Sequence, residues 1–157
     1  MKILADNKRA KFDYEIFETY EAGIVLFGHE VKSIKTGHVS LKGSYVVLKN
    51  VPDKNIPEVY LINAHVPKYK HAAQMKDYDP ERPRKLLLKK NEIEHLVGKK
   101  REKGLTFVPI KMYTKHSLIK VEFGLGRGKK KIDKREVIKK REIERKIRTL
   151  TKRRSSL

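Results

Sequence analysis

The uneven distribution of positive charge limits how this sequence can fold more than any other feature. Residues 126–157 carry 15 Lys and Arg against 4 Asp and Glu, which is +11 of a formal net charge of +20. On a helical wheel, the apolar residues that share one narrow sector are Ile132, Ile143, Ile147 and Leu150. Such a helix buries too little apolar surface to offset its ordering entropy. We therefore expect the segment to be unfolded when free and helical when a polyanion neutralises it.

A glycine-rich stretch separates this segment from the rest of the chain. Gly124, Gly126 and Gly128 predict a flexible joint. The sequence is thus interpreted as one domain, residues 1–125, followed by a basic C-terminal tail, residues 126–157. A solvated tail without function is the alternative, although 15 cations in 32 residues exceed what solubility requires.

The overall composition narrows the class of protein. The pI is near 10.1, so nucleic acid or an anionic membrane surface is the natural partner. No apolar run approaches the roughly 18 residues that span a bilayer, and the N-terminus lacks the apolar stretch of a secretory signal. The chain has no cysteine, which excludes disulfides, thiolate metal sites and thiol catalysis. We expect a soluble cytoplasmic protein with no membrane partner.

Alternating apolar and polar residues predict a mainly β domain. The strand that starts with Phe12, Tyr14 and Ile16 has a candidate bulge at Gly23 before an apolar run at 24–27. The other predicted strands are 44–49, 59–66, 105–113 and 118–125. The last two form a hairpin through 114–117, with Pro109 at an edge or a bulge.

Helical spacing predicts two short helices, at 28–37 and 91–103, with Asn91 as N-cap and Gly104 as stop. Pro67, Pro80 and Pro83 predict an irregular connection over 67–83. The expected fold is a closed antiparallel barrel of the oligonucleotide-binding type, with an open α+β sandwich as the alternative.

The sequence offers little support for an enzyme or for a metal site. It has no Walker loop, no GxSxG and no HExxH motif. The histidines are scattered without ligand-like pairing, and they are His29, His38, His65, His71, His95 and His116. Glu15, Glu18 and Glu21 form one acidic cluster, and nothing marks the second cluster that a paired-carboxylate site needs. We expect no catalytic residue, no metal and no cofactor.

Cations interleaved with aromatic residues favour nucleic-acid binding. Lys68-Tyr69-Lys70-His71 is followed by Arg82, Arg84 and Lys85, and then by 99–101 with three more cations. Lys and Arg neutralise phosphates with release of counterions, while Tyr and His rings stack on unpaired bases. The pattern does not separate RNA from DNA.

Six motifs resemble the SsrA-binding protein family, also called small protein B, in order and spacing. They are NKRA (7–10), YEAGIVL (20–26), GHEVKS (28–33), PKYKH (67–71), RKLLL (84–88) and GKKKIDKR (128–135). The resemblance covers essentially the whole chain.

The resemblance implies a bacterial RNA-binding adaptor of trans-translation that is not an enzyme. Such proteins have an oligonucleotide-binding-fold barrel and a basic tail. They bind the tRNA-like domain of transfer-messenger RNA (tmRNA) and deliver it, with elongation factor Tu and GTP, to stalled ribosomes. The tail enters the empty mRNA channel near the decoding centre of the small subunit, which leads to ribosome rescue and to tagging of the incomplete protein.

The resemblance also implies site residues. Asn7, Glu21 and Leu87 match positions that grip the RNA, and a carboxylate accepts hydrogen bonds from a base amino edge. The full predicted RNA-binding set is Asn7, Lys8, Arg9, Glu21, Lys32, Lys68, Tyr69, Lys70, His71, Arg84, Lys85 and Leu87. The predicted ribosome-contacting set is Lys129, Lys130, Lys131, Ile132, Asp133, Lys134 and Arg135.

One position departs from the family. Ile132 stands where members commonly carry His or an aromatic residue, so stacking on a ribosomal base is lost at this position. Two other functions remain open at this point: an ordinary ribosomal or tRNA-binding protein, and an RNA-modifying or RNA-cleaving enzyme. The loop at 51–58 has no assigned role.

Overall fold

The computed structural model describes residues 1–72 and 76–155, and the side chains of these residues as far as Arg153. Residues 73–75 of the predicted irregular connection and 156–157 of the predicted tail lie outside the described residues. The elements in chain order are β1 (Lys2–Asp6), α1 (Lys8–Asp13), β2 (Tyr14–Ile24), α2 (Gly28–Lys35), β3 (Tyr45–Lys49), β4 (Glu58–Ile62), β5 (Arg84–Leu87), α3 (Lys90–Lys100), β6 (Leu105–Lys115), β7 (Leu118–Gly128) and α4 (Lys131–Ser155).

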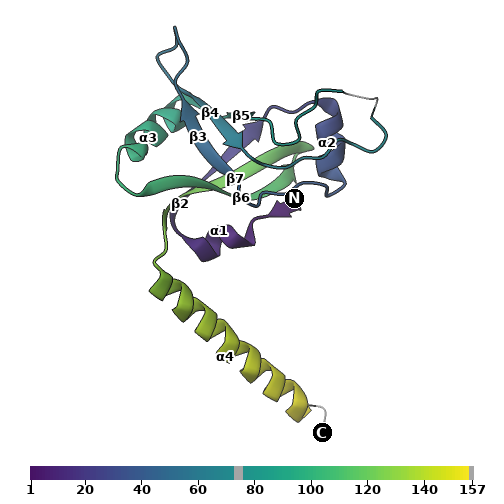
Figure 1. The fold of residues 1–157 in the computed structure, drawn as a ribbon, viewed down its shortest axis with the longest axis vertical. Coiled ribbons are helices and arrows are strands. Elements are labelled where there is room, and N and C mark those ends of the chain that lie inside the picture. Colours follow the sequence, from purple (N-terminus) through teal and green to yellow (C-terminus); the bar gives the residue numbers. More distant parts are fainter. Residues whose placement is uncertain (73–75, 156–157) are drawn as a thin grey trace.

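The strands form one antiparallel sheet in the order β1-β6-β3-β4-β5-β2-β7, and β6 also pairs with β7 (Figure 1). The sheet therefore curves back on itself, with β1 added to the edge of β6. The ring is uneven. β6 and β7 pair along their whole lengths, whereas β3 meets β6 only at Val46–Phe107 and β2 meets β5 at two residue pairs. The prediction of a mainly antiparallel β domain is confirmed.

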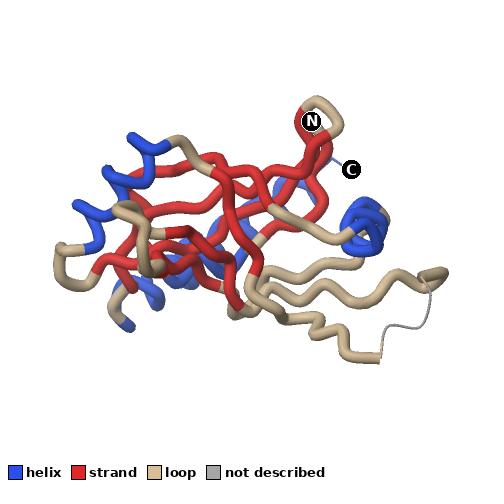
Figure 2. The backbone as a smooth tube through the Cα atoms, turned by 90° about the horizontal axis from the view of Figure 1, so that it is seen from above, coloured by secondary structure: helices blue, strands red, loops and turns tan. Residues whose placement is uncertain are grey.

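The core lies inside this curved sheet. Val121, Phe123 and Leu125 of β7 face Leu61 of β4 and Met112 of β6, and all five are at most 2% exposed. Over residues 118–123 of β7, buried residues alternate with more exposed ones, as the period-two pattern of a half-buried strand requires. Helix α3 lies at one end of this barrel-like sheet and α2 at the other (Figure 2).

The β6–β7 hairpin confirms the local turn prediction. His116 and Ser117 have φ values of 50° and 65°, so both occupy the left-handed region that a tight two-residue hairpin uses. The register of this pair shifts between Pro109 and Lys111, which confirms a bulge at Pro109. β6 is not an edge strand, because β7 pairs with it on one side and β1 pairs with it on the other side from Lys111 to Thr114.

Several predicted boundaries were wrong. The strand predicted from Phe12 begins only at Tyr14, because residues 8–13 form α1. Strand β1 was not predicted, because its stability comes from pairing with β6 more than 100 residues away. The bulge in β2 lies between Ile16 and Glu18 and not at Gly23.

Helix α3 also starts earlier than predicted. Its N-cap is Lys89, whose backbone N–H donates to Glu92 Oε2 at 2.8 Å, so Asn91 lies inside the helix. Gly104, the predicted stop, has φ +76 and lies in the turn that leads from α3 into β6.

All three glycines of the predicted flexible joint belong to strand β7, which ends at Gly128. A Cβ at Gly124 would lie 2.7 Å from Ile16 Cγ2, and a Cβ at Gly126 would lie 2.7 Å from the backbone oxygen of Glu15. These positions therefore lack side chains because β2 packs directly on the β7 backbone. Only Gly128, with open space around it, is free of such contacts.

Candidate nucleic-acid interface

The first group of predicted RNA-binding residues lies beside α2. Ser33 Oγ donates to the backbone oxygen of Pro67 at 2.8 Å and fixes the following segment against the helix. Lys32 Nζ lies 5.9 Å from the centre of the Tyr69 ring, and the ring of His71 meets Tyr69 edge-on at 5.5 Å between centroids. The structure thus brings together Lys32, Lys68, Tyr69, Lys70 and His71.

A hollow of about 350 Å³ lies between α2 and this segment. Its lining residues are Ser33, Thr36, His38, Pro67, Lys68, Tyr69, Lys70 and His71. Aromatic rings and ammonium groups share one concave surface here, which suits an unpaired base and its phosphate.

The second group lies on the outer face of β2. The Glu21 carboxylate accepts hydrogen bonds from the Tyr113 hydroxyl and from Lys115 Nζ, the latter at 3.2 Å to Oε1. Gly23, two residues further along the same face, pairs with Leu87, whose side chain is 52% exposed. An ideal Cβ at Gly23 would lie 3.4 Å from Leu87 Cβ. Glu21 and Leu87, both predicted to bind RNA, therefore belong to one surface.

A second hollow of about 310 Å³ adjoins this surface. It is mostly apolar, and its lining residues are Gly23, Ile24, Leu26, Val31, Leu87, Ser117, Leu118, Ile119 and Lys120. Sequence reasoning missed Lys115, Lys120 and Tyr113. The two lysines had a usable signal, because Lys115 lies in the predicted hairpin turn and Lys120 follows it closely.

Electrostatics keep Glu21 ionised. The hydrogen bond from Tyr113 lowers the pKa of Glu21 most, slight burial opposes it, and Lys115 and Lys120 lower it further. Burial, and then the bond to Glu21, raises the pKa of Tyr113. The outer face of β2 therefore presents an anionic acceptor on a strongly basic protein.

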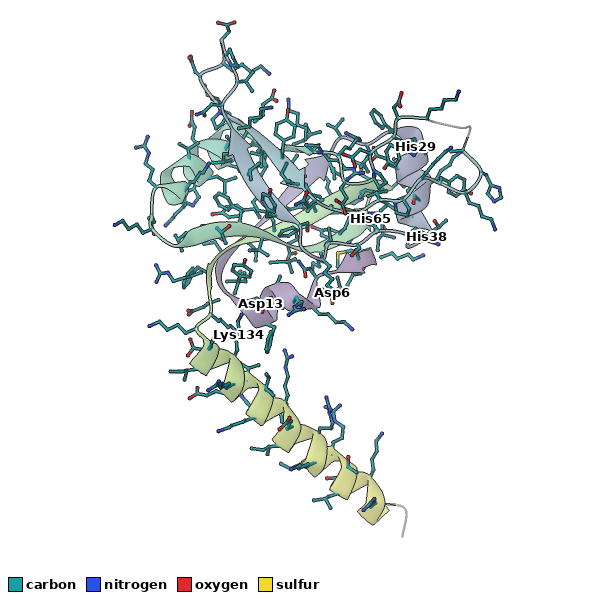
Figure 3. All side chains as sticks on the ribbon, viewed as in Figure 1. Asp6, Asp13, His29, His38, His65 and Lys134 are labelled. Carbon is teal, nitrogen blue, oxygen red and sulfur yellow. The ribbon has the colours of Figure 1, made fainter. Side chains whose placement is uncertain are left out.

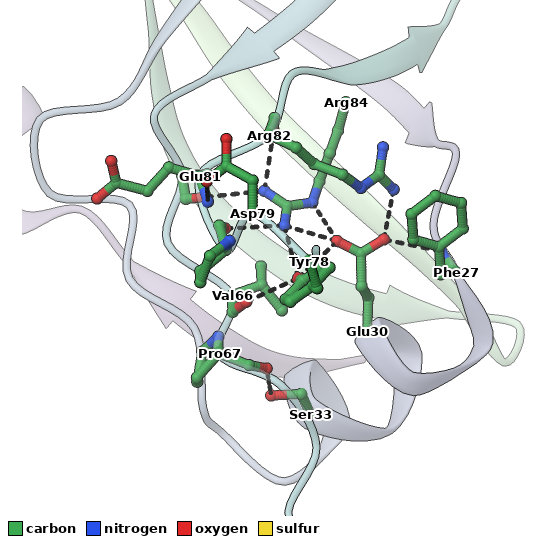
Figure 4. A network of polar contacts seen from close by, with 12 residues as sticks. Phe27, Glu30, Ser33, Val66, Pro67, Tyr78, Asp79, Glu81, Arg82 and Arg84 are labelled. Carbon is green, nitrogen blue, oxygen red and sulfur yellow. Dashed lines mark hydrogen bonds and ion pairs between the residues drawn. The ribbon is translucent and has the colours of Figure 1, made fainter. Parts of the chain in front are cut away.

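Arg84 has a different position from the one predicted. Its side chain is 0% exposed, and its Nε donates to Glu30 Oε2 at 2.6 Å (Figure 4). Arg82 donates to Glu30 Oε1, and the backbone N–H of Phe27 donates to the same oxygen at 2.8 Å. Burial raises the pKa of Glu30, but the bonds from Arg82 and Phe27 and the charge of Arg84 lower it below its ordinary value.

The Arg84 guanidinium is fully occupied inside the protein. It also donates to Ala64 O at 2.8 Å, to Pro80 O at 2.9 Å and to the Tyr78 hydroxyl at 3.0 Å. Tyr78 lies 2.8 Å from Val66 O. Arg84 is therefore corrected from an RNA contact to the centre of an internal network, which ties α2 to the segments that carry the first hollow.

Lys85, the next residue, is half-buried and paired. Its Nζ lies 3.0 Å from Glu58 Oε1, and Lys54 Nζ lies 2.7 Å from the same oxygen. Hydrogen bonds from Lys54, Tyr60 and Lys85, in that order, lower the pKa of Glu58 to about 2. Lys85 would have to exchange this carboxylate for a phosphate in order to bind RNA.

The three N-terminal candidates lie around the start of α1. Asn7 is buried, its Nδ2 donates to Pro109 O at 2.9 Å, and its side chain thereby ties the helix to β6. Lys8 and Arg9 are exposed, and they line a third hollow of about 250 Å³ with Lys42. This hollow shares no lining residue with the other two.

The tail forms helix α4, which projects away from the barrel (Figure 1). Its contacts with the barrel involve α1 (Figure 3). Lys129 N donates to Asp13 O at 2.8 Å, Lys134 Nζ lies 3.2 Å from Asp13 Oδ1, and the Arg141 guanidinium lies 5.5 Å from the Phe12 ring centre. These contacts define the α1–α4 joint.

Beyond this joint the helix is exposed. The apolar residues of α4 that remain at least 45% exposed are Ile132, Ile138, Ile143, Ile147 and Leu150. Ile132 is 68% exposed, and its side chain presents neither an aromatic ring nor a polar group to solvent. The apolar stripe is therefore without a partner within the described residues.

Within residues 1–72 and 76–155, no three His, Cys, Asp or Glu side chains form a group that would hold a metal ion. Among the described helices, none is long and apolar enough to cross a membrane.

The fold and the surface together define a small basic protein with a curved antiparallel β domain, two concave surfaces at one end and an exposed cationic helix. The chain belongs to the SmpB family, since the family model described as SmpB protein matches residues 4–153.

Relatives of similar length support this assignment. An SsrA-binding protein of Thermosipho africanus is 49% identical over 154 residues, which is 98% of this chain and 99% of the relative. One of Gloeothece citriformis is 49% identical over 152 residues, covering 97% and 94%. A solved structure described as "tmRNA-SmpB: a journey to the center of the bacterial ribosome" is 44% identical, with a TM-score of 0.63 over 85% of this chain and 92% of that chain.

Proposed function

We propose that this protein is the RNA-binding adaptor of trans-translation, which binds the tRNA-like domain of tmRNA and delivers it to stalled ribosomes. The family supports this, since its curated relatives are SsrA-binding proteins and a solved relative is described with tmRNA and the bacterial ribosome. On this proposal it acts in the cytoplasm as a binder and not an enzyme, and meets elongation factor Tu with GTP through the RNA.

The observation that carries the proposal is the ionised carboxylate of Glu21 on a surface of cations. A surface that bound only phosphates would gain nothing from an exposed anion, because phosphates repel it. A carboxylate accepts hydrogen bonds from the amino groups of bases, and RNA phosphates offer no such donors. Glu21 therefore reads bases while Leu87 packs beside it, and the barrel serves as an oligonucleotide-binding fold for structured RNA.

The concave surface beside α2 supplies the sequence-independent part of the affinity. Lys32, Lys68 and Lys70 neutralise phosphates, and Tyr69 and His71 stack on bases that the folded RNA leaves unpaired. Lys8 and Arg9 extend the positive surface around α1. Lys85 joins it once RNA displaces Glu58.

The tail supplies the ribosomal step. The part of the tail beyond β7 lacks a fixed conformation when free and becomes helical in the mRNA channel of the small subunit, where Lys129–Lys131, Lys134 and Arg135 meet rRNA phosphates. Asp133 lies in the first turn of α4, where its charge suits the positive N-terminal end of the helix. Ile132 contributes apolar contact where relatives use a ring.

Competition separates this function from ordinary tRNA binding. A complex with the labelled tRNA-like domain of tmRNA is challenged with unlabelled elongator tRNA or with the unlabelled domain, at one fixed salt concentration. We expect elongator tRNA to compete at least about tenfold less well, which corresponds to about 1.4 kcal/mol of specificity. Equal competition would instead support a general tRNA-binding protein, and turnover of the labelled RNA would support an RNA-processing enzyme.

A further inference from the structure

Glu21 does not stand alone on β2, because a buried tyrosine from another strand holds it. Tyr113 of β6 is 3% exposed, and its hydroxyl donates to Glu21 Oε2 from 92 positions away in sequence. Lys115, on the same strand, donates to both oxygens of the carboxylate at 3.2 and 3.3 Å. Two groups from β6 thus fix one side chain of β2.

The fixed carboxylate still reaches solvent. The Glu21 side chain is 38% exposed, whereas the Tyr113 ring is covered and Lys111 Nζ lies 5.5 Å from its centre. Each carboxylate oxygen has two acceptor positions. Oε2 accepts from both Tyr113 and Lys115, whereas Oε1 accepts only from Lys115, so Oε1 retains a position for a further donor from outside. Tyr113 therefore acts on Glu21 without being placed to touch an RNA itself.

A fixed acceptor binds better than a mobile one. An unrestrained Glu side chain loses rotamer freedom when it binds, which weakens the complex and blurs the geometry of recognition. A hydrogen bond from a buried hydroxyl removes that freedom in advance, because the donor is held by packing.

We propose that Tyr113 is the positioning residue that sets the Glu21 carboxylate for recognition of a base amino edge in RNA. This inference rests on the proposed function, in which Glu21 accepts from the RNA. It assigns a role in RNA recognition to a residue that lies beneath the interface.

Strand β2, which carries Glu21, also provides a matched control. Tyr20 donates to Glu18 Oε2, and Glu18 also pairs with His95 and Lys99 of α3. The Tyr20–Glu18 pair thus repeats the chemistry of the Tyr113–Glu21 pair, without a place in the proposed interface.

The experiment measures affinity for the tRNA-like domain in Tyr113→Phe, Glu21→Ala, the double variant and Tyr20→Phe. Phe keeps the buried ring and removes only the hydroxyl, so the fold is retained, and thermal unfolding checks this. We expect Tyr113→Phe to bind about 5- to 10-fold more weakly with an unchanged salt slope, because no phosphate contact is lost. Tyr20→Phe should bind as the wild type does.

The double variant separates positioning from a general structural effect. If Tyr113 acts through Glu21, adding Tyr113→Phe to Glu21→Ala costs no further affinity. An equal loss in both backgrounds would overturn the inference, as would wild-type affinity of Tyr113→Phe alone. Wild-type affinity of Glu21→Ala would remove the proposed role of Glu21 and the inference with it, so the two failures are distinguishable.

A pH profile gives an independent readout. Loss of the hydroxyl removes the largest cause of the lowered Glu21 pKa, while Lys115, Lys120 and Glu122 remain around the carboxylate. A carboxylate with a higher pKa protonates earlier as pH falls. Tyr113→Phe should therefore lose affinity at a higher pH than the wild type, whereas superimposable profiles would count against positioning.

Discussion

The Glu30–Arg84 network and helix α4 use charge in opposite ways. In the network, charges are buried and paired, and Arg84 alone donates to five different residues. In α4 most charges are exposed to solvent, and the apolar stripe faces outward. The comparison teaches that the network encloses the partners of its charges, whereas the tail takes its partners from another molecule.

Removal of the tail has the largest expected effect and tests this division. A chain that ends at Lys130 keeps β7 and the Lys129–Asp13 contact. We expect tagging of stalled products to fall at least about 100-fold, while affinity for the tRNA-like domain stays within about threefold. A shuffled tail of the same composition is the control, and loss of affinity for the isolated domain would contradict the division.

Circular dichroism of the same pair of chains tests the state of the free tail. If the tail is unfolded in the absence of a partner, the helical signal of the full chain is much smaller than a folded α4 would give. The difference in helical signal between the full and truncated chains then grows when RNA or the ribosome binds. A full helical signal without a partner would show that α4 is stable by itself.

Substitution of one arginine in each region sharpens the comparison. Arg84→Met removes the charge and leaves Glu30 buried without its main partner, so we expect a loss of about 3–5 kcal/mol in the free energy of unfolding. Arg148→Met on α4 should change it by less than about 0.5 kcal/mol. Urea unfolding measures both, and similar values for the two would mean that the network contributes no more than a surface charge.

The surface cluster at Glu58 gives the smallest expected effect, and it depends on pH. Lys54, Tyr60 and Lys85 lower the pKa of Glu58 to about 2, below its unfolded value. The resulting stabilisation is present above the unfolded pKa and is lost as pH falls toward 2. Glu58→Gln should therefore be less stable than the wild type at pH 7, and the difference should shrink below about pH 4. A stability difference between the two proteins that does not change with pH would show that the lowered pKa of Glu58 is not its cause.

Features that depend on neighbouring residues were predictable from the sequence. The β6–β7 hairpin and its bulge at Pro109 follow from local turn and proline chemistry. The concave surface beside α2 was also predictable, because Lys68, Tyr69, Lys70 and His71 are consecutive.

Features that depend on residues distant in the sequence were not predictable from it. Arg84 appeared as one cation among several, and only the fold brings it to Glu30, 54 positions away. Gly126 appeared as part of a joint, and only the fold places the β2 backbone against it. The grouping of Glu21 with Leu87 came from resemblance, but Tyr113 had no local signal that linked it to either.

When the tail is folded as α4, the α1–α4 joint sets the direction in which this helix projects. Its pivot is Asp13, which immediately precedes the strand that carries Glu21. A helix with the 25 residues of α4 is about 37 Å long. A tilt of about 10° at this pivot therefore sweeps the far tip through roughly 6 Å, so a small displacement of β2 by bound RNA would redirect the arm over a distance larger than one helical turn.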